Sequence, residues 1–396
     1  MSLSKRIRIY HILNSMSYIC TGFTGAIFVL FLYSFGFDPF HVNFLIAVSV
    51  IVIFIAEIPS GAAADIWGNR TVLFISGICL AAANLIYLIS QSYYFLILGQ
   101  VLAGVAAAML SGALEAWIFD YADFPKEKID RVCVDKNRIQ SAVTLIGGII
   151  GGIIADIGIR INFLLALMTA LIFIILVVVY IEKKQTSSND SSYAENIKAG
   201  IKRIGDVIME TYKYCLHDRN IRTIIIYSGL LTFSISNVFV SWSPLLKGNP
   251  DSNYTIIGLA WTLMQLALVG GNLVSKRLTT QLKRSLLFSS FAVGVVIILM
   301  ASINSFYAVL ILLLLFEFIL GIVNPIKETI VNYEITTKVR ATILSFQSMF
   351  SSLMYFVAML ISGWLSSTYS LSMSLAFSGI CLIVVVLLYL NVVWKN

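Results

Sequence analysis

The stretch GAAADIWGNR, residues 61–70, decides how this chain is interpreted. It spans a very short polar gap, residues 65–70, between two long apolar runs, residues 42–64 and 71–90. Asp65 falls at the end of the first run, and Arg70 falls at the start of the second. An acid, a base and glycines in so short a gap predict a tight turn between two helices that cross a membrane.

The composition indicates a membrane protein along the whole chain. Hydrophobic residues make up 59% of the sequence and charged residues only 12%, whereas ordinary soluble domains carry about 25% charged residues. Apolar stretches recur that are long enough to cross roughly 30 Å of hydrocarbon, and uninterrupted runs of this kind are helical. We therefore predict an all-α membrane protein with twelve transmembrane helices. The predicted spans are residues 9–33, 42–64, 71–90, 94–120, 139–157, 161–181, 221–246, 255–275, 285–303, 306–332, 341–366 and 370–393.

The basic residues predict the orientation. With these spans, all of the 27 Lys and Arg residues except Arg160, Lys247 and Lys327 fall in the loops and terminal tails on one side of the membrane or, for Arg222, at the end of a span on that side. Cytoplasmic loops carry such an excess of basic residues, so both termini and the 61–70 turn are expected in the cytoplasm. The net charge of +7 then follows from topology and requires no nucleic acid partner. We expect a multi-pass protein of a bacterial plasma (inner) membrane.

One long polar stretch, residues 182–220, divides the chain into a six-helix lobe over residues 1–181 and another over residues 221–396. Apolar residues at helical spacing within the stretch predict an amphipathic helix on the cytoplasmic surface. The two halves also share a faint repeat, which places Glu115 opposite Lys327. The expected architecture is therefore two pseudo-symmetric lobes joined by a cytoplasmic linker.

The pattern Gly61-x-x-x-Asp65-x-x-Gly68-x-Arg70 resembles the loop between helices two and three of the major facilitator superfamily of transporters. The resemblance implies two six-helix lobes that work by alternating access, and it implies that this turn is a gate or conformational switch. Ile66 and Asn69 depart from the family pattern, because basic residues are common at both positions.

Three further residues are candidates for the same switch. Asp120 ends the fourth predicted span and is a plausible partner for Arg70. Arg138 opens the fifth span, and Arg340 occupies the equivalent place in the second half.

A second resemblance lies in the fifth span. Gly147, Gly148, Gly151 and Gly152 resemble the Gly-Pro-x-x-Gly-Gly motif of drug/proton antiporters, with Gly148 in place of the proline. Glycines at this spacing also suit plain helix packing. The fourth span departs from the antiporter pattern, because Gln100 stands where many antiporters carry an arginine.

Ionisable residues inside predicted spans are functional candidates, because each is costly in hydrocarbon unless it faces a cavity or a partner. They are Glu57, Glu115, Glu317, Lys327 and Glu328. Glu115 is the first candidate for proton coupling, with Glu57 and Glu317 as further candidates. The alternative for Glu115 is a static ion pair with Lys327 or with an arginine.

Polar residues recur at helical spacing on spans one, four, seven and ten, the set that lines the cavity in this superfamily. Such stripes in otherwise apolar helices predict the substrate cavity. The candidate cavity residues are Asn14, Tyr18, Gln100, Ser111, Glu115, Tyr227, Asn237, Asn324 and Lys327.

The expected function is secondary active transport. We predict proton-coupled export of a small amphipathic organic molecule such as a drug or metabolite by a monomer in the lipid bilayer. The alternative is a proton-coupled importer or a facilitator of a polar solute. The chain lacks a phosphate-binding Gly-rich loop and any nucleophile or metal-ligand constellation, so we expect neither an enzyme nor a cofactor. A receptor-like relative that does not transport is disfavoured by the intact Asp65 and Arg70.

Overall fold

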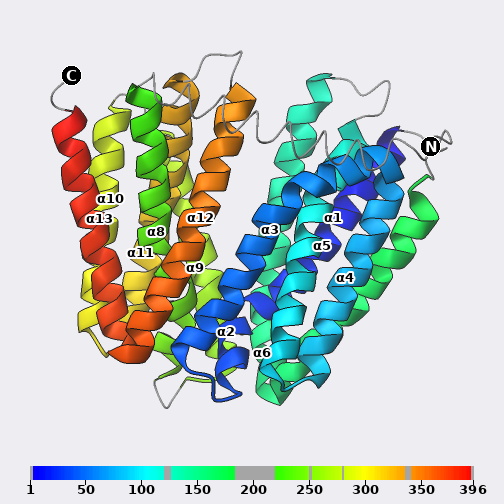
Figure 1. Cartoon of the computed structure of the whole chain (residues 1–396), viewed down its shortest axis with the longest axis horizontal. Coiled ribbons are helices and arrows are strands. Elements are labelled where there is room, and N and C mark those ends of the chain that lie inside the picture. Colours follow the sequence, from blue (N-terminus) through cyan, green and yellow to red (C-terminus); the bar gives the residue numbers. More distant parts are fainter. Residues whose placement is uncertain are drawn as a thin grey trace. The chain divides into compact units, whose positions relative to one another are not determined.

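The computed structural model describes residues 3–119, 126–182, 219–248, 252–278, 281–334 and 340–393. The secondary structure of this part of the chain is all-helical (Figure 1). The helices are α1 (Leu3–Gly25), α2 (Phe28–Tyr33), α3 (Pro39–Trp67), α4 (Asn69–Ile89), α5 (Tyr93–Phe119), α6 (Lys126–Tyr180), α8 (Arg219–Lys247), α9 (Tyr254–Ser275), α10 (Leu282–Ser302), α11 (Phe306–Glu334), α12 (Arg340–Thr368) and α13 (Leu371–Val393). The all-α membrane fold predicted from the sequence is therefore confirmed.

Ten of the described helices are long and apolar enough to cross a membrane. One of them, the 50-residue segment Arg131–Tyr180, turns at Gly158, whose backbone is extended (φ 178°, ψ 114°). The predicted spans 139–157 and 161–181 lie on either side of this turn. The predicted span 9–33 is divided between α1 and α2, and α1 is not among the ten because its polar residues lower its mean hydropathy.

Several helices extend beyond the predicted spans, and two of these extensions involve candidate residues. α3 continues to Trp67, so Asp65 lies within the helix and the gap before α4 shrinks to Gly68. α6 begins at Lys126, so the residues that precede Arg138, which lie outside the predicted span 139–157, belong to the same helix as that span. Most of the predicted linker, residues 183–218, and the candidate switch residue Asp120 fall outside the described residues.

The chain divides into two compact units. Unit 1 comprises Met1–Phe28, Val48–Gly205 and Tyr254–Leu259, and unit 2 comprises Val29–Ala47, Asp206–Asn253 and Ala260–Asn396. The first turn of α9 thus belongs with α6 in unit 1, and the first part of α3 belongs with α12 in unit 2.

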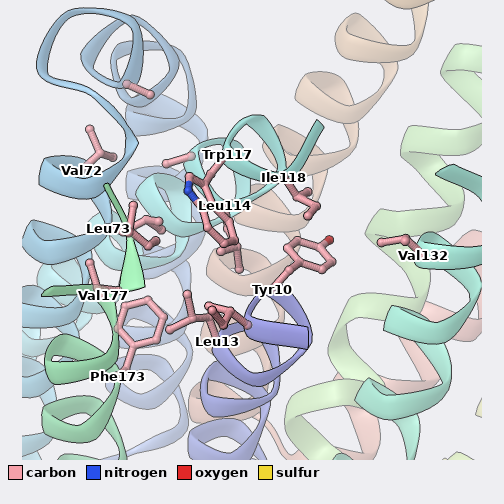
Figure 2. Close-up of a cluster of buried hydrophobic side chains, with 14 residues drawn as sticks. Tyr10, Leu13, Val72, Leu73, Leu114, Trp117, Ile118, Val132, Phe173 and Val177 are labelled. Carbon is pink, nitrogen blue, oxygen red and sulfur yellow. The ribbon is translucent and has the colours of Figure 1, made fainter. Parts of the chain in front are cut away.

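The core of unit 1 gathers side chains from five helices, α1, α3, α4, α5 and α6, at the end where α1 begins. Figure 2 shows Tyr10 and Leu13 of α1 with Leu114 and Trp117 of α5 and Phe173 of α6. Each of these side chains is at most 4% exposed. Lipid surrounds apolar side chains as favourably as protein does, so burial alone does not bring membrane helices together. Close packing of this kind is what stabilises their contact. The cluster fixes the ends of α1, α5 and α6 relative to one another.

In unit 2, α3 begins with a capping arrangement. The Asp38 carboxylate accepts a hydrogen bond from the backbone N–H of His41 (3.0 Å), and Pro39 occupies the first helical position, which suits proline. Ser367 of α12 donates to Asp38 (2.7 Å), and the Asn43 amide donates to Ser362 (3.1 Å). Polar contacts thus tie the start of α3 to α12.

Candidate functional site

The turn within residues 61–70 is made by Gly68. Its φ of 79° lies in the left-handed region, which favours glycine. Its N–H donates to the Ala64 carbonyl (3.0 Å) and its carbonyl accepts from Thr71 (3.1 Å). Gly68 therefore ends α3 and starts α4 at a single residue.

Arg70 holds the end of another helix. Its guanidinium donates to the carbonyl of Val178 (2.8 Å), in the last turn of α6, where backbone carbonyls have no partner within the helix. A cation there also complements the negative end of the helix dipole. Arg70 thus connects the turn to the α6 terminus in unit 1.

None of the other switch candidates takes part in a described contact with Arg70. Arg138 is exposed and lies 3.6 Å from Asp135 on its own helix. Gly61 and Asp65 lie on α3 and Arg340 opens α12, and the surroundings of their side chains are outside the described part.

A second arginine, which the sequence interpretation counted only as part of a basic tail, anchors α5. Arg6 is 8% exposed, and its guanidinium donates to the Trp117 carbonyl, with Nε at 3.2 Å. The same guanidinium lies 4.4 Å from the centroid of the Trp117 ring, a cation–π contact. Helical periodicity is the signal that was available, because Arg6 shares a face with buried Ile9, Tyr10 and Leu13.

Glu115, the first proton-coupling candidate, forms an ion pair within unit 1. Its carboxylate lies 2.5 Å from the Nζ of Lys136 on α6, and its side chain is 52% exposed. The partner is therefore a lysine that the sequence interpretation placed in a loop. This arrangement fits the static ion pair that was the alternative for Glu115 better than it fits an unpaired coupling carboxylate.

Glu317 on α11 has different surroundings. The residue is only 4% exposed, and within the described part of the chain no hydrogen bond or ion pair joins its carboxyl to another group. Glu57 on α3 and Glu328 on α11 are exposed, whereas Asn324 and Lys327 are half-buried. Of the three proton-coupling candidates, Glu317 is thus the buried one.

The polar candidates on α1 and α5 are sparsely bonded. Asn14 is 7% exposed and Gln100 is 4% exposed, and the side-chain amide nitrogen of each has no hydrogen-bond partner among the described residues. Tyr18 is half-buried. Ser111 is exposed, and among the described residues its hydroxyl bonds the Ala108 carbonyl of its own helix (3.2 Å).

The polar candidates on α8 are fully engaged within unit 2. The Asn237 amide donates to Ser374 (3.0 Å) and Ser378 (3.1 Å) of α13, and its oxygen accepts from Ser241 (3.0 Å). The Tyr227 hydroxyl donates to Ser290 of α10 (2.6 Å). These side chains join helices to one another.

The four glycines of the predicted fifth span face two different neighbours. A Cβ on Gly147 would lie 2.7 Å from Gly22 Cα on α1, and one on Gly151 would lie 2.6 Å from the Phe23 carbonyl. Gly152 faces the start of α9, because a Cβ on it would lie 3.1 Å from Gly258 Cα. Gly148 lies on the same side, since its carbonyl would be 2.3 Å from a Cβ on Gly258. The glycines therefore let backbones approach on both sides of α6.

Asp156, which the sequence interpretation did not single out, caps the start of α9 within unit 1. Its carboxylate accepts from the N–H of Tyr254 (2.7 Å), from the N–H of Thr255 (2.9 Å) and from the Thr255 hydroxyl (2.6 Å). These backbone donors have no partner within their own helix, and a carboxylate suits the positive helix terminus. The glycine contact and this cap hold the same two segments together.

These features define a polytopic helical membrane protein whose polar groups join helix ends. The sequence model of the Major Facilitator Superfamily matches residues 11–358, and the chain belongs to that family. A relative in Bacillus subtilis (strain 168), described as an uncharacterized MFS-type transporter YxaM, is 21% identical over 242 residues. That match covers 60% of this chain and 58% of the relative.

Solved structures share the fold at low sequence identity. A mutant of the nucleoside transporter NupG superposes with a TM-score of 0.80 at 10% identity and covers 98% of this chain and 99% of its own. A POT family transporter in complex with 5-aminolevulinic acid gives 0.73 at 13% identity, covering 97% and 95%. The D-xylose-proton symporter gives 0.72 at 14% identity, covering 98% and 97%. The chain thus has the fold of known transporters.

Proposed function

We propose that the chain is a proton-coupled secondary transporter that exports a small amphipathic organic molecule by alternating access. In this proposal it acts as a monomer in a bacterial inner membrane, with both termini in the cytoplasm. Membership of the superfamily supports secondary transport. The glycines of α6, which resemble those of drug/proton antiporters, support export.

The observation that carries proton coupling is the burial of Glu317. A carboxylate without a partner in a membrane-embedded, buried position is costly, so the residue is expected to carry a proton in at least one state of the cycle. A carboxyl that gains and loses a proton as the surroundings change couples the proton gradient to transport. Glu115 becomes the second candidate, because its charge is already balanced by Lys136 (2.5 Å).

A proton-coupled importer or facilitator of a polar solute is the alternative function. The specific observation in its favour is Gln100, which is buried with an amide nitrogen that has no described partner. An uncharged donor at this place, where many antiporters carry an arginine, suits a polar neutral solute. Two of the solved relatives are, by name, a nucleoside transporter and a D-xylose-proton symporter.

The test is transport by purified protein in proteoliposomes with an imposed pH gradient. Candidate solutes are screened first, and the direction of gradient-driven movement distinguishes export from import. The variant Glu317→Gln should abolish gradient-driven transport but retain solute exchange without a gradient, because the neutral amide mimics the protonated carboxyl. The matched control is Glu328→Gln on the same helix, whose carboxylate is exposed. Full coupling in Glu317→Gln would contradict the assignment of Glu317, and loss of exchange in that variant would indicate damage to the fold.

A further inference from the structure

A groove that the transport proposal does not use lies within unit 1, between the start of α1 and the end of α6. Its volume is about 480 Å³, within the range of small-molecule sites. Residues of both helices line it, and they include Lys5, Arg8, Ile9, Ile12, Leu176 and Tyr180. Both helices end here, at the limit of the apolar sequence, so the groove lies where a membrane meets water.

The charge in the groove is positive. Lys5 and Arg8 are exposed, and residues three apart lie on the same face of a helix. Arg6, between them, points away and is consumed by its bonds to Trp117. No carboxylate is among the described residues that line this groove, whereas the adjoining cavity, which shares Arg8 and Ile12 with the groove, also contains Asp135. The groove therefore favours an anion.

The remainder of the groove is lined mainly by apolar side chains, and further exposed apolar side chains lie on α6 next in sequence to the groove residues Leu176 and Tyr180. Ile12 is 41% exposed, and Ile175 and Val179 on α6 are 60% and 64% exposed. The Lys5 ammonium lies 5.8 Å from the centroid of the Tyr180 ring, and tyrosines are enriched at the membrane–water boundary. A ligand that matches both parts has an anionic head and an acyl chain.

We propose that this groove is a binding site for an anionic phospholipid, with the phosphate on Lys5 and Arg8 and an acyl chain along Ile12 and Leu176. Charge complementarity selects the occupant, since guanidinium and ammonium groups bind phosphate and basic residues at the membrane surface attract anionic lipid. The lipid stabilises the packing of the α1 start against the α6 end, the segment that Arg70 also holds.

The test is native mass spectrometry of the delipidated full chain titrated with dioleoyl-phosphatidylglycerol or dioleoyl-phosphatidylcholine in neutral detergent. The wild type should bind the anionic lipid preferentially. The double variant K5A/R8A should bind it about 30-fold more weakly, because each basic residue at an anionic surface is worth about a factor of five. Binding of phosphatidylcholine should not change.

Further variants serve as controls for position and charge and test the apolar part of the groove. The matched control K276A/R277A removes two adjacent exposed basic residues that directly follow α9 and should bind like the wild type. The charge-preserving variant K5R/R8K should also retain binding, and Leu176→Trp should weaken it by filling the groove while both charges remain.

Three results would overturn the proposal. The first is unchanged phosphatidylglycerol binding in K5A/R8A, and the second is equal affinity of the wild type for both lipids, which would indicate a merely apolar groove. The third is full displacement of the lipid by an equal concentration of soluble glycerol phosphate, which would indicate an anion site without a place for the chain.

Discussion

The polar residues of α5 and of α8 look alike in the sequence but have different surroundings. On α8, Asn237 and Tyr227 direct their polar atoms to serines of α13 and α10 at 2.6–3.1 Å. On α5, the Gln100 amide nitrogen has no described partner, and Glu115 is half-exposed beside Lys136. A stripe of polar side chains in a membrane helix therefore has two uses. One joins helices within a unit, and the other, in the transport proposal, leaves the Gln100 amide nitrogen available to a solute.

The strongest test of this contrast is a pair of polar-to-apolar substitutions. Asn237→Leu should destabilise the protein by about 2 kcal/mol, because three hydrogen bonds are lost at about 0.6 kcal/mol each in membrane proteins. Gln100→Leu should change stability by less than about 0.5 kcal/mol, since its nitrogen has no described bond to lose. Thermal unfolding in detergent, monitored by dye labelling of the buried Cys20, measures the stability of both variants. Equal losses in the two variants would remove the distinction between the helices.

A second prediction concerns Arg6, the buried cation that bonds the end of α5. Arg6→Leu should destabilise unit 1 by about 1–2 kcal/mol, because a cation at a helix C-terminus and over an aromatic ring contributes on that order. Arg6→Lys keeps the charge and should lose less than half as much. The same unfolding assay compares the two, and equal losses would assign the effect to the shape of the arginine and not to its charge.

A smaller effect is expected for the ion pair of Glu115 with Lys136. A double-mutant cycle of Glu115→Gln and Lys136→Met should give a coupling free energy below about 1 kcal/mol, as exposed ion pairs do. Transport measured in the same variants distinguishes a coupling role of Glu115 from a structural one. If Glu115 couples protons, its variant should lose gradient-driven transport while stability hardly changes. That outcome would return Glu115 to first place among the proton-coupling candidates.

The smallest expected effect is the pH dependence contributed by Asp38 in unit 2, which lies before α3. Burial raises the pKa of its carboxyl, but hydrogen bonds from Ser367 and His41 outweigh burial and hold the pKa below its ordinary value of 3.8. A depressed carboxyl pKa stabilises the folded state above the unfolded pKa, and this contribution is lost as the pH falls through the folded pKa. The difference in unfolding temperature between wild type and Asp38→Asn should therefore stay constant from about pH 7 to pH 5 and shrink below about pH 4. A difference that grows toward low pH would contradict the assigned sign.

Helix-level features of this protein could be predicted from local sequence. Long apolar runs define membrane helices whatever surrounds them, because hydrocarbon admits no unpaired backbone. Gly68 illustrates the same point, since a gap of so few residues requires a backbone conformation that glycine adopts readily. The break at Gly158 was likewise visible as the interval between two predicted spans.

The partners of the polar side chains could not be predicted in this way. Asp156 was passed over because its value depends on the N-terminus of α9, which lies about 100 positions away in the sequence and comes close only in the folded unit. Arg6 was interpreted only as one of the basic residues that mark the cytoplasmic side, because a basic tail explains its charge equally well. The ion pair of Glu115 required the start of α6 to be helical through Lys136.

The sequence by itself determined that the chain is a helical membrane protein, where its helices lie and which motif links it to its family, because hydropathy and glycine geometry act over a few residues. Only the tertiary structure decided which polar groups are used for packing and which carboxyl is buried. Those outcomes depend on how far each helix is rotated about its axis and on which helix lies beside it. Residues 61–70 therefore specify a turn, and the contact of Arg70 with the end of α6 specifies what that turn holds.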